Sequence, residues 1–180
     1  MRNGMRNRWG FTLLEILVVM MIVGIMLTIG GSNLLLWLDH AAAVDFQREI
    51  LSRSNDARTR AMASNLQHRM RVDITGETIT LQRGNLGSGS TSWSNVGNPI
   101  VGNRGAGIQE IVYDNGTTVS ASTNSFIFNP GGQVLALDNS TIILPMNQAR
   151  IRLTAGNTAD RATIRIFGFT SKARLENGWN

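Results

Sequence analysis

The sequence contains no cysteine, and this absence excludes several kinds of site. Without cysteine no disulfide staples the fold, no thiolate acts as a nucleophile, and no zinc ion is held by sulfur, while the redox compartment stays undecided. Histidine is also scarce: His40 and His68 lie far apart, and we expect each to be solvated. No acid and base pair or serine, histidine and aspartate set is recognisable. We therefore predict a protein that is not an enzyme, with no catalytic residues, cofactor or metal.

The excess of positive charge is small once its position is considered. The 180 residues include 17 basic and 12 acidic side chains, a formal net charge of +5. Three of the basic residues, Arg2, Arg6 and Arg8, precede a long apolar run, and without them 14 basic residues face 12 acidic ones, a net of +2. The length allows one domain of ordinary size plus an appendage. The charge of the folded part therefore predicts only weak attraction to nucleic acid.

The apolar run near the N-terminus is long enough to cross a bilayer. Only Gly24 and Thr28 interrupt the aliphatic residues of 16–29, and with the flanking residues 11–14 and 34–38 the run exceeds the roughly 20 residues that a spanning helix needs. No small-residue cleavage site of the kind that ends a secretory signal peptide follows it. The arginines before the run predict a cytoplasmic N-terminus, so the bulk of the chain lies outside the cytoplasm.

Glu15 is the unusual residue of this run. A charged side chain at the centre of a membrane costs about 2.5 to 3.5 kcal/mol on insertion scales, so an acid within a spanning segment indicates a function. The alternative is an ordinary signal-anchor helix in which the glutamate has no role. The carboxylate needs a positively charged partner, and the sequence around it suggests one.

The stretch GFTLLE at 10–15, behind an arginine-rich leader and ahead of the aliphatic run, resembles the type IV prepilin motif of type IV pilins and type II secretion pseudopilins. The resemblance implies that a membrane prepilin peptidase cuts between Gly10 and Phe11 and methylates the new N-terminus at Phe11. It also implies that Glu15 forms a salt bridge with the N-terminal amine of a neighbouring subunit and so acts in filament assembly. Many major pilins have a proline past the middle of the run, where this chain has Gly30, Gly31 and Ser32, which makes a local flexible joint plausible.

The helix is expected to continue beyond the apolar run to about residue 65. Acidic and basic residues follow each other at the favourable i,i+4 spacing in Glu49 and Arg53 and again in Asp56 and Arg60. Small or apolar residues recur three or four positions apart, which places them on one face that should cover a globular domain. These residues are Ala43, Phe46, Ile50, Ser54, Ala57 and Ala61.

After the helix the pattern changes to the period of two that is typical of strands. Residues 70–74 and 79–81 alternate across the turn Thr75-Gly76-Glu77, which predicts a hairpin. Further strands are predicted near 108–113, 118–122, 125–128, 133–137, 141–144, 150–154 and 162–167. The Gly/Ser-rich segment 84–107 has no periodicity, so we expect a surface loop. The alternative is an insertion that packs through Trp93, Val96 and Ile100.

The fold class predicted is therefore α+β: a long N-terminal helix, membrane-spanning in its first half and amphipathic in its second, packed on an antiparallel sheet or two-sheet domain. The expected divisions are a leader at 1–10, a transmembrane or filament-core helix at 11–38, its amphipathic continuation at 39–65, and a β-rich periplasmic domain at 66–180. This layout, with FNPGGQVLALDNSTIILP and a closing ATIRIFGFTSKAR, resembles the H-type pseudopilins and FimT/FimU-like minor pilins.

That resemblance implies a minor subunit that primes assembly at the tip of a pseudopilus or pilus. Its partners would be the prepilin peptidase, other pilins or pseudopilins and inner-membrane lipid, and its FNPGG segment, residues 128–132, would be a structural turn. Its location would be the inner membrane, as a single-pass protein with a periplasmic C-terminal domain, and then the filament. The alternatives are a DNA-binding minor pilin for natural transformation and a membrane-tethered domain that does not polymerise.

The DNA-binding alternative depends on C-terminal arginines. If 150–154 and 162–167 pair with their aliphatic residues inward, several cations share the outer face and could hold phosphates without reading bases. The candidate strip consists of Arg150, Arg152, Arg161, Arg165, Lys172 and Arg174. FimT-like pilins of transformable bacteria bind DNA through a glycine-arginine-x-arginine element, and the corresponding place here reads GFTS at 168–171. We therefore prefer a solvated polar face, with DNA as a partner that is possible but not preferred.

Overall fold

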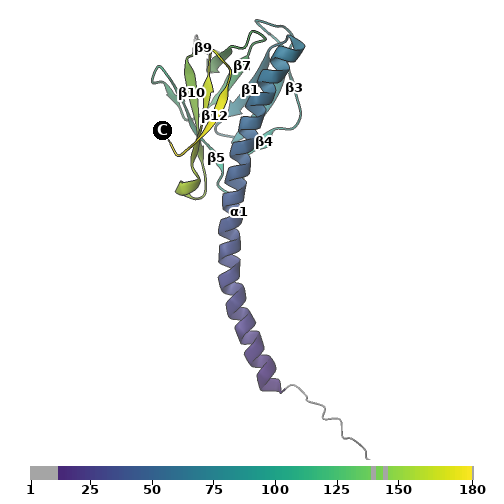
Figure 1. The fold of residues 1–180 in the computed structure, drawn as a ribbon, viewed down its shortest axis with the longest axis vertical. Helices are drawn as coiled ribbons and strands as arrows, with labels where there is room; N and C mark the ends of the chain where they lie inside the picture. The colour runs from purple at the N-terminus through teal and green to yellow at the C-terminus, as the bar shows by residue number, and fades with distance from the viewer. Residues whose placement is uncertain (1–11, 139–140, 144–145, 180) are drawn as a thin grey trace, which may run out of the picture. The chain divides into compact units, whose positions relative to one another are not determined.

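The structure is a computed structural model that describes residues 12–138, 141–143 and 146–179, without the side chains of 29–33 and 138 and 141–143. It divides into two units, residues 1–38 and 39–180, which are treated separately below. One helix, α1 (Leu13–Ser64), forms most of the described part of the first unit and continues into the second (Figure 1). The predicted leader and the residues of the cleavage site, Gly10 and Phe11, lie outside the described residues.

Local side-chain chemistry sets both ends of α1. At the start, Thr12 precedes the first turn and its Oγ1 accepts a hydrogen bond from the backbone N–H of Glu15 at 3.2 Å, as an N-cap residue does. At the end, Asn65 has a positive φ of 55°, a conformation in which asparagine commonly terminates helices. The helix is continuous through Gly30, Gly31 and Ser32, where the sequence suggested a flexible joint.

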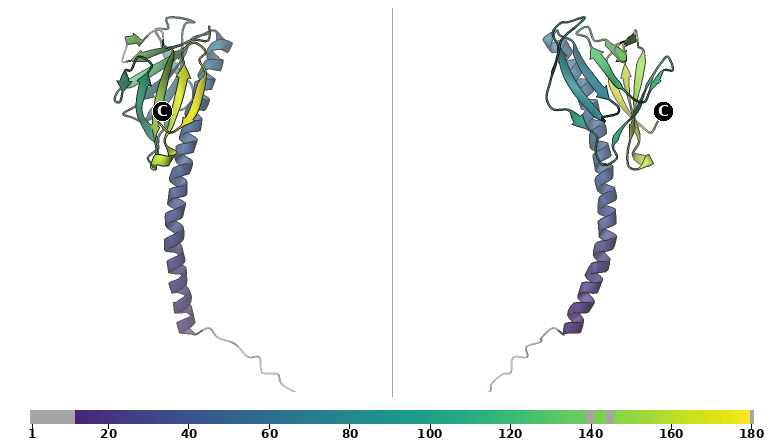
Figure 2. Two further views of the ribbon diagram at one scale, coloured as in Figure 1. Left: turned by 60° about the vertical axis from the view of Figure 1, so that its left-hand side comes forward. Right: turned by 180° about the vertical axis from the view of Figure 1, so that it is seen from behind.

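The β elements form two antiparallel sheets, which Figure 2 shows as separate groups of strands. The first sheet has the order β3-β2-β1-β7-β8-β9, with β4 also pairing with β2. Its strands are β1 (His68–Asp73), β2 (Thr78–Gly84), β3 (Trp93–Asn95), β4 (Ile100–Val101), β7 (Thr123–Phe128), β8 (Val134–Asp138) and β9 (Thr141–Ile143). The two-sheet form of the predicted α+β fold is therefore present.

The second sheet contains the arginine-rich hairpin. Its order is β12-β11-β10-β5-β6, and a short 3-10 helix, η1 (Thr158–Asp160), connects β10 to β11. Its strands are β5 (Gly107–Tyr113), β6 (Thr118–Val119), β10 (Gln148–Thr154), β11 (Ala162–Phe167) and β12 (Ala173–Asn177). The sequence predicted every strand of the two sheets except β3, β4 and β12.

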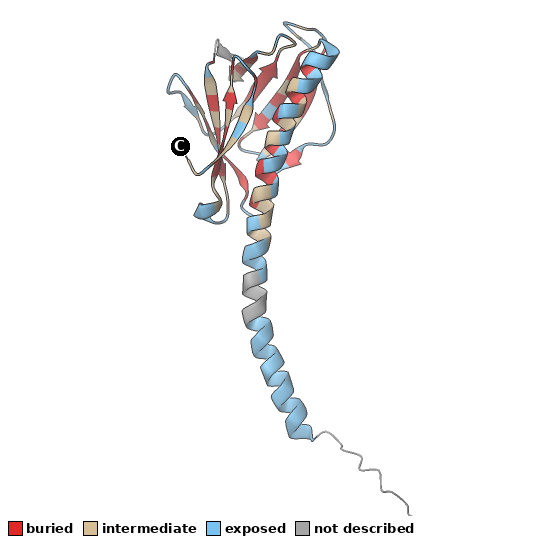
Figure 3. Cartoon of the chain, viewed as in Figure 1, coloured by how far each residue is buried: buried red, intermediate tan, exposed pale blue. Residues whose placement is uncertain are grey.

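The second half of α1 covers the core as its period predicts. Ile50, Ala57 and Ala61 are fully buried, and Ala43, Phe46 and Ser54 are at most 5% exposed. Figure 3 shows that buried residues recur along the part of the helix within the 39–180 unit. Alanine and serine on this face let the helix backbone approach the sheets, whose inward residues include Phe126, Ile151 and Ile164. The predicted i,i+4 pairs are also present, Arg60 with Asp56 at 2.7 Å and Arg53 with Glu49 at 3.8 Å.

The segment 84–107 packs as an insertion and not as the loop we preferred. Its two short strands, β3 and β4, both pair with β2. Ile100 is 3% exposed and Val96 packs against the core, while the guanidinium of Arg69 lies 4.3 Å from the ring centre of Trp93. Trp93, Val96 and Ile100, the residues through which an insertion was expected to pack, therefore do contact the rest of the domain. The segment is rich in glycine and serine, so its sequence shows no alternation that would predict strands. Its two short strands form by pairing with β2.

Candidate functional site

The first candidate site is the N-terminal part of α1, around Glu15. The acid lies in the first helical turn, where its negative charge favours the positive end of the helix dipole. Beside it is a hollow of about 300 Å³ lined by Glu15, Ile16, Val19 and Met20. A single carboxylate is thus presented on an otherwise apolar helix surface. Such a surface favours a partner that brings one positive charge within apolar surroundings.

The described apolar side chains of this first unit are exposed from Leu13 to Trp37. Leu13 is 83% exposed and Leu27 71%, and every described residue between them is exposed as well. A continuous apolar surface of this kind indicates contact with lipid or with other protein. Among the residues whose placement is described, no helix meets the length and hydropathy required to cross a membrane.

The second candidate site is the outer face of β10 and β11, where the sequence predicted an arginine strip. The predicted hairpin is confirmed, with Arg150 opposite Arg165 and Ile151 opposite Ile164. Buried and half-buried residues alternate along β10, so the aliphatic side chains point inward and the arginines outward. The register of the hairpin therefore places Arg150 and Arg165 next to each other on the outer face.

The arginines of this face are nevertheless engaged within the fold. Arg152 Nη1 donates to Glu110 Oε1 on β5 at 2.6 Å, and both side chains are half-buried. Arg165 Nη2 donates to Glu176 Oε2 on β12 at 2.8 Å. The guanidinium of Arg161 lies 4.2 Å from the ring centre of Trp179. The expectation that Arg152 and Arg165 point freely into water is therefore wrong, because neighbouring strands supply carboxylates.

The remaining cations of the predicted strip differ from one another. Arg150 is half-buried and takes part in interactions within the fold. Arg174 is exposed on β12, opposite Arg165. Lys172 is exposed in the β11–β12 turn, where it lines a different surface with Arg58 and Phe169. The six residues therefore do not form one uniform anion-binding strip.

The two histidines are not simply solvated, contrary to the expectation from sequence. His40 is exposed, but its Nδ1 lies 2.7 Å from Asp160 Oδ1 of η1. The same loop is held by Gln47, whose Nε2 donates to the Asp160 carbonyl oxygen at 2.6 Å. Both contacts tie α1 to the β10–β11 connection. Since the partners are 113 and 120 residues away in sequence, no local pattern could identify them.

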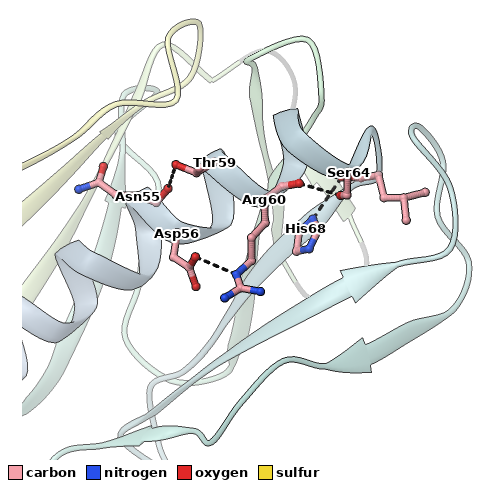
Figure 4. A network of polar contacts seen from close by, with 7 residues as sticks. Asn55, Asp56, Thr59, Arg60, Ser64 and His68 are labelled. Atoms are coloured by element: carbon pink, nitrogen blue, oxygen red, sulfur yellow. Dashed lines mark hydrogen bonds and ion pairs between the residues drawn. The ribbon is translucent and has the colours of Figure 1, made fainter.

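His68 is buried at the start of β1, close to the end of α1. It is 2% exposed, and its Nδ1 lies 3.2 Å from the Leu66 carbonyl oxygen. Figure 4 shows this histidine beneath the last turns of α1, near the Asp56 and Arg60 pair and the Ser64 hydroxyl that donates to the Arg60 carbonyl. Burial lowers the pKa of His68, and the positive charge of Arg60 lowers the pKa further. No group of three or more potential metal ligands occurs in the described part of the chain.

Comparison with known proteins supports both the N-terminal motif and the fold. The prokaryotic N-terminal methylation motif matches residues 5–31, which confirms the motif predicted from GFTLLE. A search of curated proteins by sequence gives no match. Two structures of the minor pseudopilin EpsH from the type 2 secretion system of Vibrio cholerae resemble the chain, with TM-scores of 0.51 and 0.52 at 14% and 13% identity.

The EpsH alignments extend over most of both chains. They cover 77% and 78% of this chain and 98% and 96% of the EpsH chains. The type IV minor pilin FimU of Pseudomonas aeruginosa (strain PAO1) aligns with a TM-score of 0.44 at 16% identity, over 76% of this chain and 90% of that chain. The EpsH comparison confirms the predicted pilin-like α+β fold, a long helix packed on antiparallel sheets.

Proposed function

We propose that this chain is a minor pilin or pseudopilin, a structural subunit of a type II secretion pseudopilus or a type IV pilus. The observation that carries the proposal is the N-terminal methylation motif at residues 5–31, which includes the exposed apolar residues of α1 from Leu13 to Leu27. The fold shared with EpsH supports it. The role is non-enzymatic, since a filament subunit acts through its contacts with neighbours.

The proposal includes processing and membrane anchoring. The prepilin peptidase cuts between Gly10 and Phe11, and Phe11 becomes the methylated N-terminus. Before assembly the apolar part of α1 anchors the chain in the inner membrane, with the leader in the cytoplasm and residues 39–180 in the periplasm. The arginines of the leader support this orientation, because positive residues favour the cytoplasmic side.

Glu15 then acts as the assembly residue. Cleavage creates a positive amine at Phe11, and a lone charge is very unfavourable in the apolar interior of a filament. The Glu15 carboxylate of one subunit neutralises the amine of its neighbour and fixes the register of the packed helices. The exposed position of Glu15 on an otherwise apolar helix surface supports this pairing.

Intact-mass spectrometry of the membrane-extracted protein tests the proposal. Wild-type protein from a host with the peptidase should lack residues 1–10 and carry one added methyl group on Phe11. Gly10→Val should remain full length, because a branched side chain does not fit a site that accepts glycine. Gly4→Val, the same change within the leader but away from the cut, should be processed normally. An uncleaved wild-type chain in that host would reject the proposal.

The other two functions considered are not favoured. Nucleic-acid binding through the C-terminal arginines is opposed by the pairing of Arg152 with Glu110 and of Arg165 with Glu176. A tethered domain that does not polymerise leaves the exposed Glu15 without a role. Recovery of the processed chain in the sheared filament fraction separates a subunit from a tethered domain.

A further inference from the structure

A groove in the 39–180 unit brings together three elements that are distant in sequence. It is open to solvent, has a volume of about 560 Å³, and lies over the end of α1, the β7–β8 turn and the β11–β12 turn. We call it the Phe169 groove, and its lining residues are Arg58, Met62, Pro130, Gly131, Gly132, Phe169, Thr170 and Lys172. Its lining thus contains two cations and no carboxylate.

The groove also exposes large apolar side chains. Phe169 is 59% exposed and Met62 46% exposed. In the described part of residues 39–180 the only other large apolar side chains this exposed are Leu86 and Val101. Two of these four therefore line one groove, with Pro130 beside them. An apolar patch rimmed by polar groups is typical of a protein interaction site.

The turn that carries Phe169 is anchored by its own contacts although its tip is exposed. Ser171 is 1% exposed and has a φ of 47°, a left-handed conformation that is uncommon for residues other than glycine. Arg58 Nε donates to Ser171 Oγ at 2.9 Å, which ties the turn to α1. This hydrogen bond and the burial of Ser171 anchor the turn to the helix.

Gly168, the residue before Phe169, has both its backbone N–H and its backbone carbonyl hydrogen-bonded. The Gly168 N–H donates to the Asn147 carbonyl at 2.8 Å, and the Gly168 carbonyl accepts from the Val134 N–H at 2.7 Å. A Cβ at Gly168 would lie against the Met146 carbonyl oxygen, so only glycine fits this close approach. The contacts at Gly168 and Ser171 together direct Phe169 outward.

We infer that the Phe169 groove is the docking surface for a neighbouring filament subunit, and that it receives a segment carrying an apolar side chain beside a carboxylate. The inference rests on the proposed function and names a surface for it. The aromatic and aliphatic lining accommodates the apolar side chain, while Arg58 and Lys172 attract the carboxylate. A protein segment is favoured over nucleic acid because two cations neutralise few phosphates, whereas most of the other lining side chains offer apolar contact.

Photo-crosslinking of the full chain in assembled filaments tests this inference. A benzophenone-bearing phenylalanine replaces Phe169 in one strain and Leu17, in the N-terminal half of α1, in another. Mass spectrometry then identifies the partner residue. The Phe169 site should crosslink to one subunit, at a peptide in which an apolar residue neighbours an aspartate or glutamate. Replacing that acid with lysine should reduce the crosslink.

A charge introduced into the groove provides the specific test. Gly131 has open space around an added Cβ and no left-handed φ, so Gly131→Glu should fold normally. The new carboxylate should lower the yield of the Phe169 crosslink about tenfold, because like charges facing each other oppose docking. Thr117→Glu, which adds the same charge on the exposed β5–β6 turn, is the matched control and should leave the yield unchanged. Combining Gly131→Glu with lysine at the partner's acid should restore the crosslink.

The outcomes separate this inference from the proposed function. A crosslink from Leu17 but none from Phe169 would overturn the docking surface and leave the filament role intact. No crosslink from either site would overturn both. Crosslinking of Phe169 to nucleotides, or to a peptide without an acidic residue, would overturn the docking of an acidic segment. Equal yields for Gly131→Glu and Thr117→Glu would overturn it as well.

Discussion

Arg165 on β11 and Glu176 on β12 form a charge-assisted hydrogen bond across neighbouring strands, with 2.8 Å between Nη2 and Oε2. Arg165 also lies opposite Arg150 and Arg174 in the register of the sheet, and like charges directly opposite each other are destabilising. The carboxylate of Glu176 offsets part of that repulsion. The arginines therefore belong to a charge network within the sheet, and this determines how they act toward outside anions.

The first prediction concerns duplex DNA. Full-length protein in detergent should bind duplex DNA weakly, because Arg152 and Arg165 already form ion pairs with Glu110 and Glu176. Changing both acids to glutamine should strengthen binding and steepen the dependence of log K on log salt by about 1.8, the value for two further phosphate contacts. Mobility-shift titrations at two salt concentrations measure both quantities. Tight wild-type binding that is lost in Arg152→Gln/Arg165→Gln would contradict the prediction.

The second prediction concerns Glu15. Glu15→Leu should insert and be cleaved as the wild type is, because leucine favours the bilayer by about 0.3 to 0.6 kcal/mol. Incorporation into filaments should nevertheless fall, since the neighbour's N-terminal amine has lost its partner. The ratio of filament to membrane protein measures the effect. Leu14→Ile, at an exposed position next to Glu15, serves as the control, and an equal ratio for Glu15→Leu and the control would refute the pairing.

The third prediction concerns the packing of α1 on the core. Ala57 is fully buried, so Ala57→Leu should destabilise the fold by about 1 to 3 kcal/mol through overpacking. Thr59→Leu, two positions away on the exposed face, should change the free energy of unfolding by less than about 0.5 kcal/mol. Urea unfolding followed by circular dichroism compares the two variants. Equal midpoints would show that this face of the helix tolerates extra volume.

The fourth prediction concerns pH and His68. Burial, followed by the charges of Arg60 and Arg83, lowers its pKa in the fold below the ordinary 6.5, although the Leu66 carbonyl and Asp56 oppose this. The unfolded chain therefore binds the proton more readily, so stability is complete above about pH 6.5 and falls as the pH decreases toward the folded pKa. The urea midpoint should be lower at pH 5.5 than at pH 7.5.

A variant isolates the contribution of this histidine. His68→Gln removes the titrating group and retains a polar side chain, so the difference in midpoint between the two pH values should shrink. His40→Gln is the matched control at an exposed histidine. Its urea midpoint should still differ between the two pH values by the amount that His68 contributes. If His68→Gln retains the whole difference, other groups cause the pH dependence.

The amino-acid pattern was sufficient wherever structure depends on neighbours in sequence. The buried face of α1 from Ala43 to Ala61 follows from the helical period, and the β1–β2 and β10–β11 hairpins follow from alternation across short connections. The N-terminal motif was likewise recognisable, because its glycine, threonine and glutamate stand at short, fixed spacings. The helix, most strands and the candidate assembly residue were thus predictable from local sequence alone.

Only the tertiary structure decided which distant groups meet. Glu110 reaches Arg152 because β5 lies next to β10, 42 residues away in sequence, and no periodicity encodes that order of strands. His68 is buried because α1 ends above β1, and the Phe169 groove exists because two turns and the end of α1 converge. The sequence by itself determined which face of the helix and of the predicted strands points inward. The pairing of the outward charges and the shape of the exposed surface depend on the packing of elements distant in sequence, since contact between them arises only when the sheets assemble on the helix.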